Sequence, residues 1–181
     1  MTQQGKNAID LVLAESLIEL SAKKPIDKIT IKEITDKAGV IRPTFYNHFQ
    51  DKYELIEWII KTELLEPIKP LLNAGMIFEA IVLMLNNISA NSVFYKKALK
   101  LEGAVTFNQI AMKCVCEKST GKKSKYRWLT PEVISTYYAQ SLCFITEGWI
   151  AQGMDDIEPK EMAEAYMYLI TRSMDDILSE L

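Results

Sequence analysis

Apolar residues recur at intervals of three and four along almost the whole sequence, and this spacing constrains the fold more than any other feature. The first segment shows it in Ile9, Leu13 and Leu17, which would share one face of a helix. No segment shows a sustained alternation of apolar and polar residues, the pattern of a half-buried strand. We therefore expect an all-α fold of about nine helices.

Capping signals divide the N-terminal part of the chain into short helices. Thr30 and Glu33 have the spacing of a capping box, in which each side chain bonds a backbone N–H group of the other residue. Gly39 can adopt the left-handed conformation that ends a helix. Asp51 and Glu54 repeat the capping-box spacing and start another helix.

Two prolines, Pro67 and Pro70, follow this last helix, and we expect them to break the chain at a domain boundary. The predicted domains are 7–67 and 68–181. Between residues 118 and 127 lies a loop with five basic residues and no acidic ones. Helical patterns in the second domain cover 76–90, 92–101, 104–117, 131–152 and 159–181.

The segment 31–49 combines a short helix, a turn at Gly39-Val40-Ile41 and a second short helix. Two short helices joined by a glycine-containing turn of three or four residues are typical of a helix-turn-helix. The steep crossing lets the second helix enter a major groove about 12 Å wide while the first braces it. We place the motif at about residues 31–50.

Hydrogen-bonding side chains cluster on the second helix of this motif. Arginine can bond to guanine and asparagine to adenine, while threonine, tyrosine and histidine can reach phosphate oxygens. The residues concerned are Arg42, Thr44, Tyr46, Asn47 and His48, and Lys52 adds a charge at the start of the next helix. Of the two neighbouring aromatic residues we assign Phe45 to the core.

Four linked motifs together resemble the TetR family of regulators. They are ITIKEI at 29–34, AGV at 38–40, TFYNHF at 44–49 and DKYEL at 51–55, within the first 65 or so residues. The resemblance implies a three-helix DNA-binding domain followed by a helical ligand-binding and dimerisation domain. It further implies a ligand-responsive transcriptional regulator, a repressor or an activator, that binds a palindromic double-stranded operator as a homodimer.

The resemblance also assigns roles to individual residues. Thr44, Tyr46, His48 and Lys52 match phosphate-contacting positions of the family, and the base-facing positions are Arg42, Pro43 and Asn47. With Thr30 and Lys32 at the start of the first motif helix, these residues complete the predicted DNA-binding set.

Two positions depart from the family pattern. Ile41 stands where serine or another capping residue is usual, so the recognition helix lacks a side-chain N-cap, a loss of about 1 kcal/mol. Thr35 stands at the helix crossing, where a small alanine is usual.

The second domain resembles the family in its expected architecture. The segment EGWIAQGM at 147–154 resembles a branch that includes dihydroxyacetone-kinase operon regulators. By this likeness the last two helices pair with those of a second subunit. Their apolar residues are Val133, Tyr137, Phe144 and Trp149 on one helix and Met162, Tyr166, Leu169, Ile170, Met174 and Ile177 on the other.

A pocket for a small-molecule effector is expected among the middle helices. Aromatic and methionine residues at helical spacing more often belong to a core than to a pocket, so the core alternative stays open. The candidate lining residues are Phe78, Phe94, Tyr95, Phe107, Asn108, Met112, Trp128, Tyr138 and Gln140.

Composition excludes several other classes of protein. The net charge of −3 means that any DNA contact uses a local basic patch. The three cysteines and the single histidine show no metal-ligand spacing, and no phosphate-binding loop or nucleophile motif occurs, so we expect neither an enzyme nor a bound metal or cofactor. With no signal peptide and no apolar run of about 20 residues, we expect a cytoplasmic protein without a membrane span.

One alternative function stays open. A protein-binding co-regulator with the same fold but little DNA binding of its own would also fit the missing cap and the near-neutral N-terminal half. A steep dependence of DNA affinity on salt concentration would distinguish the two, because phosphate contacts release counterions.

Overall fold

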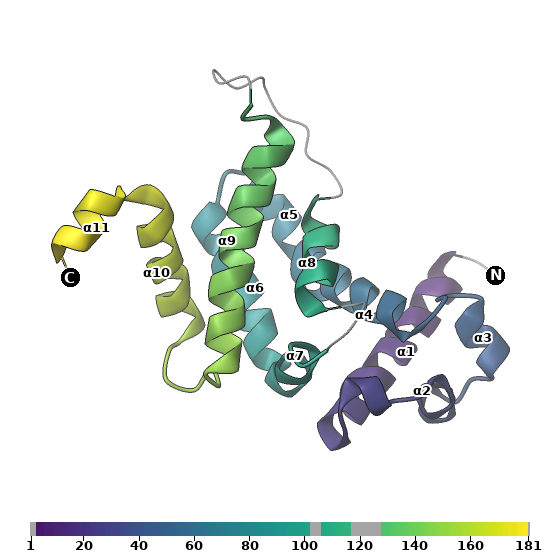
Figure 1. The fold of residues 1–181 in the computed structure, drawn as a ribbon. Helices are drawn as coiled ribbons and strands as arrows, with labels where there is room; N and C mark the ends of the chain where they lie inside the picture. The colour runs from purple at the N-terminus through teal and green to yellow at the C-terminus, as the bar shows by residue number, and fades with distance from the viewer. Residues whose placement is uncertain (1–2, 102–105, 117–127, 181) are drawn as a thin grey trace.

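The computed structural model describes residues 3–101, 106–116 and 128–180, which form helices joined by turns, with no strand among them (Figure 1). The all-α prediction is confirmed. The N-terminal helices lie at one end of the molecule and the C-terminal helices at the other (Figure 1). The basic loop at 118–127 falls outside the described residues.

The N-terminal unit consists of α1 (Gln3–Lys23), the short 3-10 turn η1 (Ile26–Lys28), α2 (Ile31–Ala38), α3 (Arg42–Tyr46) and α4 (Lys52–Ile60). Each helix contributes fully buried apolar side chains, because the spacing of three and four places them on its inner face. Leu17, Ile34, Phe45 and Leu55 have no exposed surface. The three helices α1, α2 and α4 thereby hold the short α3 in place.

The predicted caps are largely confirmed. Glu33 N donates to Thr30 Oγ1 at 3.3 Å and Thr30 N donates to Glu33 Oε2 at 2.9 Å, which completes the capping box. Gly39 ends α2 in the left-handed conformation, with φ 69°. Asp51 caps α4, but Glu54 accepts from Gln50 N instead of closing the box on Asp51 N.

The expected chain break at Pro67 and Pro70 is wrong. After α4 the chain passes through a π-helical turn, η2 (Lys61–Leu65), directly into α5 (Glu66–Asn73). Pro67 is the second residue of α5, directly after the π-helical turn, and the helical conformation continues through it. The two parts of the chain are thus joined by consecutive helical segments.

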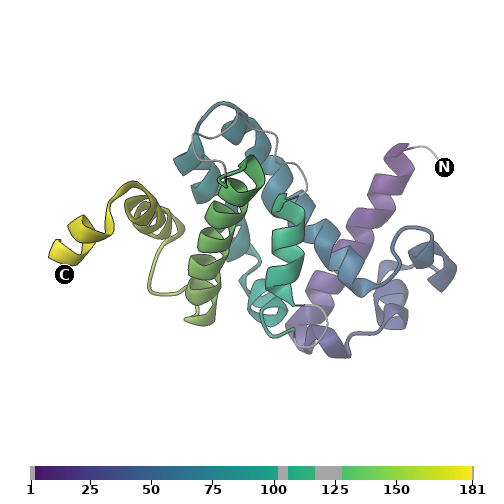
Figure 2. The same ribbon diagram turned by 45° about the horizontal axis from the view of Figure 1, so that its top comes forward.

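The C-terminal region contains α6 (Ile77–Ala90), α7 (Ser92–Ala98), α8 (Phe107–Cys116), α9 (Pro131–Ala151), α10 (Pro159–Thr171) and α11 (Met174–Glu180). Helix α8 packs beside α9, as Figure 2 shows, while α10 packs against α6. The single helix expected at 159–181 is wrong. Arg172 adopts an extended conformation, and Ser173 Oγ then accepts from Asp176 N at 3.2 Å to begin α11.

A single continuous apolar core links both parts of the molecule, from Leu13 in α1 to Tyr166 in α10. Helix α7 contacts α1, and α8 contacts α4, so the C-terminal helices touch the N-terminal unit at two places. Within the described ranges, no single helix is long and apolar enough to cross a membrane; α6 and α7 pass that test by length and composition as a pair bent by 90°.

Candidate DNA-binding site

The α2–turn–α3 segment forms a helix-turn-helix whose inner side is tightly packed. Ile34 of α2 and Phe45 of α3 are fully buried, and Val40 N donates to Thr35 O at 3.0 Å to fix the turn. Thr35 is 1% exposed, and its hydroxyl donates to Lys32 O at 3.0 Å. The threonine that replaces the usual alanine is therefore accommodated without an unsatisfied polar group.

The N-terminal end of α3 faces solvent. Ile41 occupies the N-cap position without a side-chain hydrogen bond, as predicted, and 69% of its surface is exposed. Arg42 and Pro43 are exposed beside it, and Thr44 is half-buried. In helix-turn-helix proteins the N-terminal residues of the recognition helix are those that contact base edges.

The two neighbouring aromatic residues of α3 differ in exposure although their rings are in contact. Phe45 is buried, which confirms its assignment to the core, while Tyr46 is 51% exposed and meets the Phe45 ring edge to face at 5.7 Å. Asn47 is the C-cap of α3 and is exposed. Tyr46 is thus available for a phosphate, and Asn47 lies at the end of α3 away from Arg42.

His48 is directed inward. Its side chain is 2% exposed, and its Nδ1 atom lies 2.6 Å from Oδ1 of Asp10 in α1. This placement differs from the phosphate contact implied by the resemblance. His48 instead ties the turn after α3 to the first helix.

Lys52 also has partners within the chain. Its Nζ donates to the backbone carbonyls of Ile26, Asp27 and Ile29 at 3.0, 2.6 and 3.1 Å. Burial lowers the pKa of Lys52, because loss of water disfavours its charged form. In this structure the ammonium group caps η1.

Thr30 and Lys32 lie at the start of α2. The Thr30 hydroxyl serves the capping box, donating to Glu33 Oε2 at 2.7 Å. Lys32 Nζ pairs with Asp36 Oδ2 at 2.6 Å, but its side chain is 70% exposed. Lys28, just before α2, is 75% exposed and was missed in the sequence because it lies outside the two motif helices.

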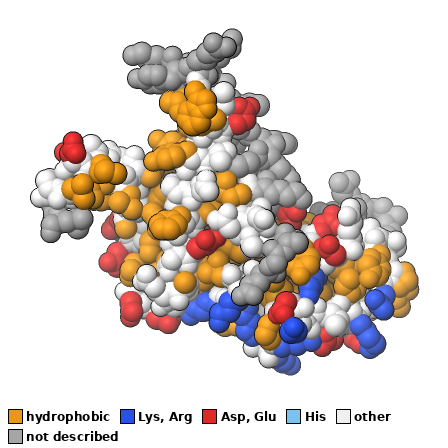
Figure 3. Space-filling model, in the orientation of Figure 1, with side chains coloured by type: hydrophobic (Ala, Val, Ile, Leu, Met, Phe, Trp, Pro, Cys, Tyr) orange, Lys and Arg blue, Asp and Glu red, His pale blue; other side chains and the backbone are white. Residues whose placement is uncertain are grey.

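Lys and Arg side chains gather along the lower edge of the molecule, beneath α7 and the N-terminal helices (Figure 3). Asp and Glu side chains lie among them on the same edge (Figure 3), and the chain as a whole has a net charge of −3, so a phosphate contact depends on individual exposed cations. Among the described residues, no group of three or more His, Cys, Asp or Glu side chains could hold a metal ion.

Comparison with known proteins agrees with this geometry. Residues 15–59 match the family of bacterial regulatory proteins named tetR, and residues 76–172 match a transcriptional regulator C-terminal region. The chain belongs to the TetR family of transcriptional regulators. This family and the relatives below are regulators of transcription, not enzymes.

One TetR-family relative is the HTH-type dhaKLM operon transcriptional activator DhaS of Lactococcus lactis subsp. lactis (strain IL1403). It is 26% identical over 150 residues, which cover 78% of this chain and 79% of DhaS. This match confirms the predicted likeness to the branch of dihydroxyacetone-kinase operon regulators.

Two solved structures show the same fold. The dihydroxyacetone kinase operon activator DhaS matches with a TM-score of 0.62 at 21% identity, covering 95% of each chain. NalD, the secondary repressor of the MexAB-OprM multidrug efflux pump in Pseudomonas aeruginosa, matches with a TM-score of 0.60 at 14% identity, covering 91% of this chain and 94% of NalD.

The predicted effector-pocket residues of this TetR-family chain do not line one cavity: some form an aromatic cluster in the core, and others lie at the start of α9. Phe94, Tyr95 and Phe107 are at most 5% exposed and belong to the core, while Asn108 donates to Glu147 Oε1 at 3.0 Å. Phe78 packs against the core and Met112 is half-buried. Helical spacing in the sequence does not distinguish such core residues from a cavity lining.

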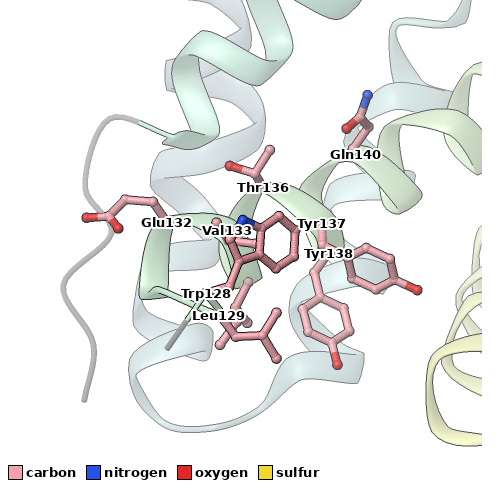
Figure 4. A pocket seen from close by; sticks show the side chains of 9 residues that line it. Trp128, Leu129, Glu132, Val133, Thr136, Tyr137, Tyr138 and Gln140 are labelled. Carbon is pink, nitrogen blue, oxygen red and sulfur yellow. The ribbon is translucent and has the colours of Figure 1, made fainter. Parts of the chain in front are cut away.

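A hollow of about 800 Å³ lies instead at the N-terminal end of α9 (Figure 4). Its lining includes three of the predicted residues, Trp128, Tyr138 and Gln140, with Glu132 and Tyr137 beside them. The Trp128 indole ring lies between the Glu132 and Gln140 ends of this group (Figure 4). Trp128 is 75% exposed, so the hollow opens widely to solvent.

A polar cluster that the sequence did not reveal surrounds Glu63 in the π-helical turn. Tyr95 OH and Asn91 Nδ2 donate to Glu63 Oε2 at 3.3 and 3.1 Å, and Asn87 Nδ2 donates to Glu63 O at 2.7 Å. Burial raises the pKa of Glu63, and the hydrogen bonds from Tyr95 and Asn91 oppose that rise. The cluster ties the segment that follows α4 to α6 and α7.

Helix α7 also reaches the N-terminal unit. Lys97 Nζ donates to the carbonyl of Ser21 and, at 3.4 Å, to that of Lys24, at the C-terminal end of α1. A cation is favourable there because helix carbonyls lack intrahelical partners. Since Tyr95 and Lys97 belong to the same helix, α7 connects the π-helical turn with α1.

Proposed function

We propose that this chain is a cytoplasmic, ligand-responsive transcriptional regulator that binds a palindromic operator as a homodimer. Residues 7–67 would form the DNA-binding domain, and residues 68–181 the effector-binding and dimerisation domain. The observation that carries the proposal is the exposed N-terminal end of α3, with Arg42 and Pro43 on a helix-turn-helix whose other face is buried.

The contacts we propose follow the exposure of each side chain. Arg42 and Pro43 would face base edges, with Asn47 at the far end of α3. Tyr46, Thr44, Thr30 and Lys32 would bind phosphates. His48 and Lys52 would position the recognition helix and η1, since their polar atoms already have partners inside the chain.

Exposed apolar residues on the last helices support dimerisation. On α9, Tyr137 is 67% exposed and Phe144 77%; on α11, Met174 is 75% exposed. Leu169 and Leu178 extend this face at 46% and 62%. Of the other predicted interface residues, Trp149, Met162 and Tyr166 pack inside the chain, and Val133, Ile170 and Ile177 are half-buried. Large exposed apolar patches mark interaction sites, and two such helices from each subunit would make a four-helix interface.

Sedimentation velocity tests the dimer directly. We expect the parent to sediment as a dimer and Phe144→Glu as a monomer with unchanged helical content. Val93→Glu is the matched control, because Val93 is 49% exposed but lies on α7. A monomeric parent, or equal dimerisation of Phe144→Glu and the parent, contradicts the proposed interface.

Fluorescence anisotropy with DNA from around the protein's own gene tests operator binding. We expect saturation at two subunits per site and a log–log salt slope of about −0.9 for each phosphate contacted. If binding equals that to scrambled DNA even at low salt, and selection from a random duplex pool also enriches nothing, the proposal fails. The alternative of a protein-binding co-regulator is then favoured.

Ligand response would act through the connecting helices. A ligand that binds one arrangement of α4 to α7 better than another increases the population of the dimer conformation with that arrangement. The separation of the two recognition helices would change with it. Half-sites are read about one helical turn apart, so a small change in separation weakens binding. Because the relatives include both an activator and a repressor, a promoter–reporter assay in a deletion strain decides the direction of regulation.

A further inference from the structure

Ile41 places a branched apolar side chain at the exposed N-terminal end of the recognition helix. It is 69% exposed and forms no side-chain cap hydrogen bond. An apolar residue at an N-cap costs about 1 kcal/mol relative to serine. The position therefore loses a cap and gains an apolar side chain that packs against nothing in this chain's core.

The neighbours of Ile41 define which way this end of α3 faces. Phe45, one turn further on, is fully buried in the core, and α3 packs against α2. Ile41 itself has an extended backbone, with φ −86° and ψ 152°, and its carbonyl accepts from Thr44 N at 2.9 Å. Its side chain is thus exposed beside Arg42 and Pro43, at the end that meets base edges in helix-turn-helix proteins.

We propose that Ile41 reads thymine through its C5-methyl group, so that each operator half-site carries a thymine at one fixed position. This inference rests on the proposed operator binding. The thymine methyl is the apolar feature that a base pair offers in the major groove. Isoleucine has no donor or acceptor, so a polar cytosine or guanine edge against it would lose water without a replacement hydrogen bond.

The test uses the tightest duplex that the full-length protein selects from a random pool. Each thymine is replaced in turn by deoxyuridine, which lacks only the C5-methyl group, and affinities are measured at one salt concentration. We expect one position per half-site to weaken binding about fourfold, which is the transfer energy of a buried methylene, about 0.8 kcal/mol, converted at 1.4 kcal/mol per tenfold.

Two variants connect this position with Ile41. Ile41→Ser supplies the missing cap, so it folds at least as stably as the parent, and it should bind thymine and deoxyuridine duplexes equally. Pro43→Ala removes a neighbouring apolar side chain and should retain the fourfold difference. Replacing the critical thymine by 5-methylcytosine should weaken parent binding less than replacing it by cytosine, because the methyl group is kept.

The outcomes separate this inference from the proposed function. If the duplex binds tightly but no deoxyuridine matters, or if Ile41→Ser keeps the difference, Ile41 does not read thymine and operator binding stands. If Pro43→Ala alone removes the difference, the methyl contact belongs to Pro43 and the inference is overturned. If selection enriches no duplex over scrambled DNA, the proposed function itself fails.

Discussion

His48 Nδ1 lies 2.6 Å from Asp10 Oδ1 and joins the turn after the recognition helix to the first helix. The two residues are 38 positions apart in the sequence, and their side chains are 2% and 9% exposed. Removing one partner of a buried pair leaves the other without a hydrogen bond, which costs more than the pair itself contributes. The orientation of the α3 end therefore depends on a residue remote from the DNA-binding motif.

We expect Asp10→Ala to lower the free energy of unfolding by about 1–3 kcal/mol, because the His48 ring loses its buried acceptor. Asp10→Asn keeps an acceptor oxygen for the His48 ring and should lower the free energy of unfolding by less. Urea unfolding measures both variants, and DNA affinity under folding conditions should fall more in Asp10→Ala than in Asp10→Asn. Equal stability of Asp10→Ala and the parent would show that the pair does not hold this turn.

Glu33 predicts a dependence of stability on acid pH. Hydrogen bonds from Lys24 and from Thr30 lower the pKa of Glu33 from its ordinary value of 4.5 to about 2. A lowered folded-state pKa stabilises the fold above pH 4.5, and this contribution disappears as the pH falls from 4.5 to about 2. Glu33→Gln should therefore unfold at a lower temperature than the parent near neutral pH, and the difference should shrink toward about pH 2. A constant difference across this window contradicts the assignment; Glu15→Gln, at an exposed position on α1, is the control.

The partly buried carboxyl group of Glu63 predicts a pH dependence of stability opposite in sign to that of Glu33. Burial raises the folded-state pKa of Glu63, so protonation favours the folded state, and this advantage is lost as the pH rises through the raised pKa. Glu63→Gln is neutral at every pH and can still accept from Tyr95 and Asn91. We expect the melting temperature of Glu63→Gln relative to the parent to increase from acid to neutral pH. Scanning calorimetry across that range measures it, and a difference that falls with pH would contradict the raised pKa.

Lys97 predicts a link between α7 and the DNA-binding unit. Lys97→Met keeps an extended apolar side chain but leaves carbonyls at the end of α1 without their charged donor, so the free energy of unfolding should fall by about 0.5–1.5 kcal/mol. Lys100→Met removes the same charge from an exposed position nearby and should have little effect. Hydrogen exchange at the last turn of α1 should accelerate in Lys97→Met alone; equal exchange in both variants would show that Lys97 does not stabilise this turn.

Local features of the fold were predictable from the sequence because they depend on residues three or four positions apart. The Thr30–Glu33 capping box and the left-handed Gly39 are of this kind, and the structure contains both. The Glu63–Tyr95 hydrogen bond spans 32 positions, and no periodic pattern encodes which polar residues of different helices meet. The effector-pocket prediction failed at Phe94 and Phe107 for the same reason. Their spacing predicts that they are buried, but not whether they pack against other side chains or line a cavity.

The positions of prolines did not predict where the helices break, because the conformation of neighbouring segments also decides it. Pro67 was expected to break the chain, yet the preceding π-helical turn lets α5 begin with proline in its first turn. The break in the last helical segment occurs instead at Arg172, where neither glycine nor proline is present. The partners of two predicted DNA-contacting side chains were equally hidden in the sequence: His48 is buried against Asp10, and Lys52 Nζ donates to backbone carbonyls around η1.

Lys28 and Lys52 predict two separable effects on DNA binding. Lys28, just before α2, is 75% exposed and forms only an exposed ion pair with Asp27 Oδ2 at 3.3 Å, which a phosphate could replace, whereas Lys52 Nζ donates to three carbonyls around η1. Lys28→Ala should leave stability nearly unchanged and reduce the steepness of the log–log salt slope by about 0.9 for each bound subunit, as expected when one phosphate contact is lost. Lys52→Ala should instead lower the free energy of unfolding by about 0.5–1.5 kcal/mol, because three carbonyls that are exposed or partly buried lose a charged donor. Paired salt titrations and urea unfolding of both variants measure the two effects. A reduced salt slope for Lys52→Ala at unchanged stability would instead assign Lys52 to the phosphate backbone, as the family resemblance implies.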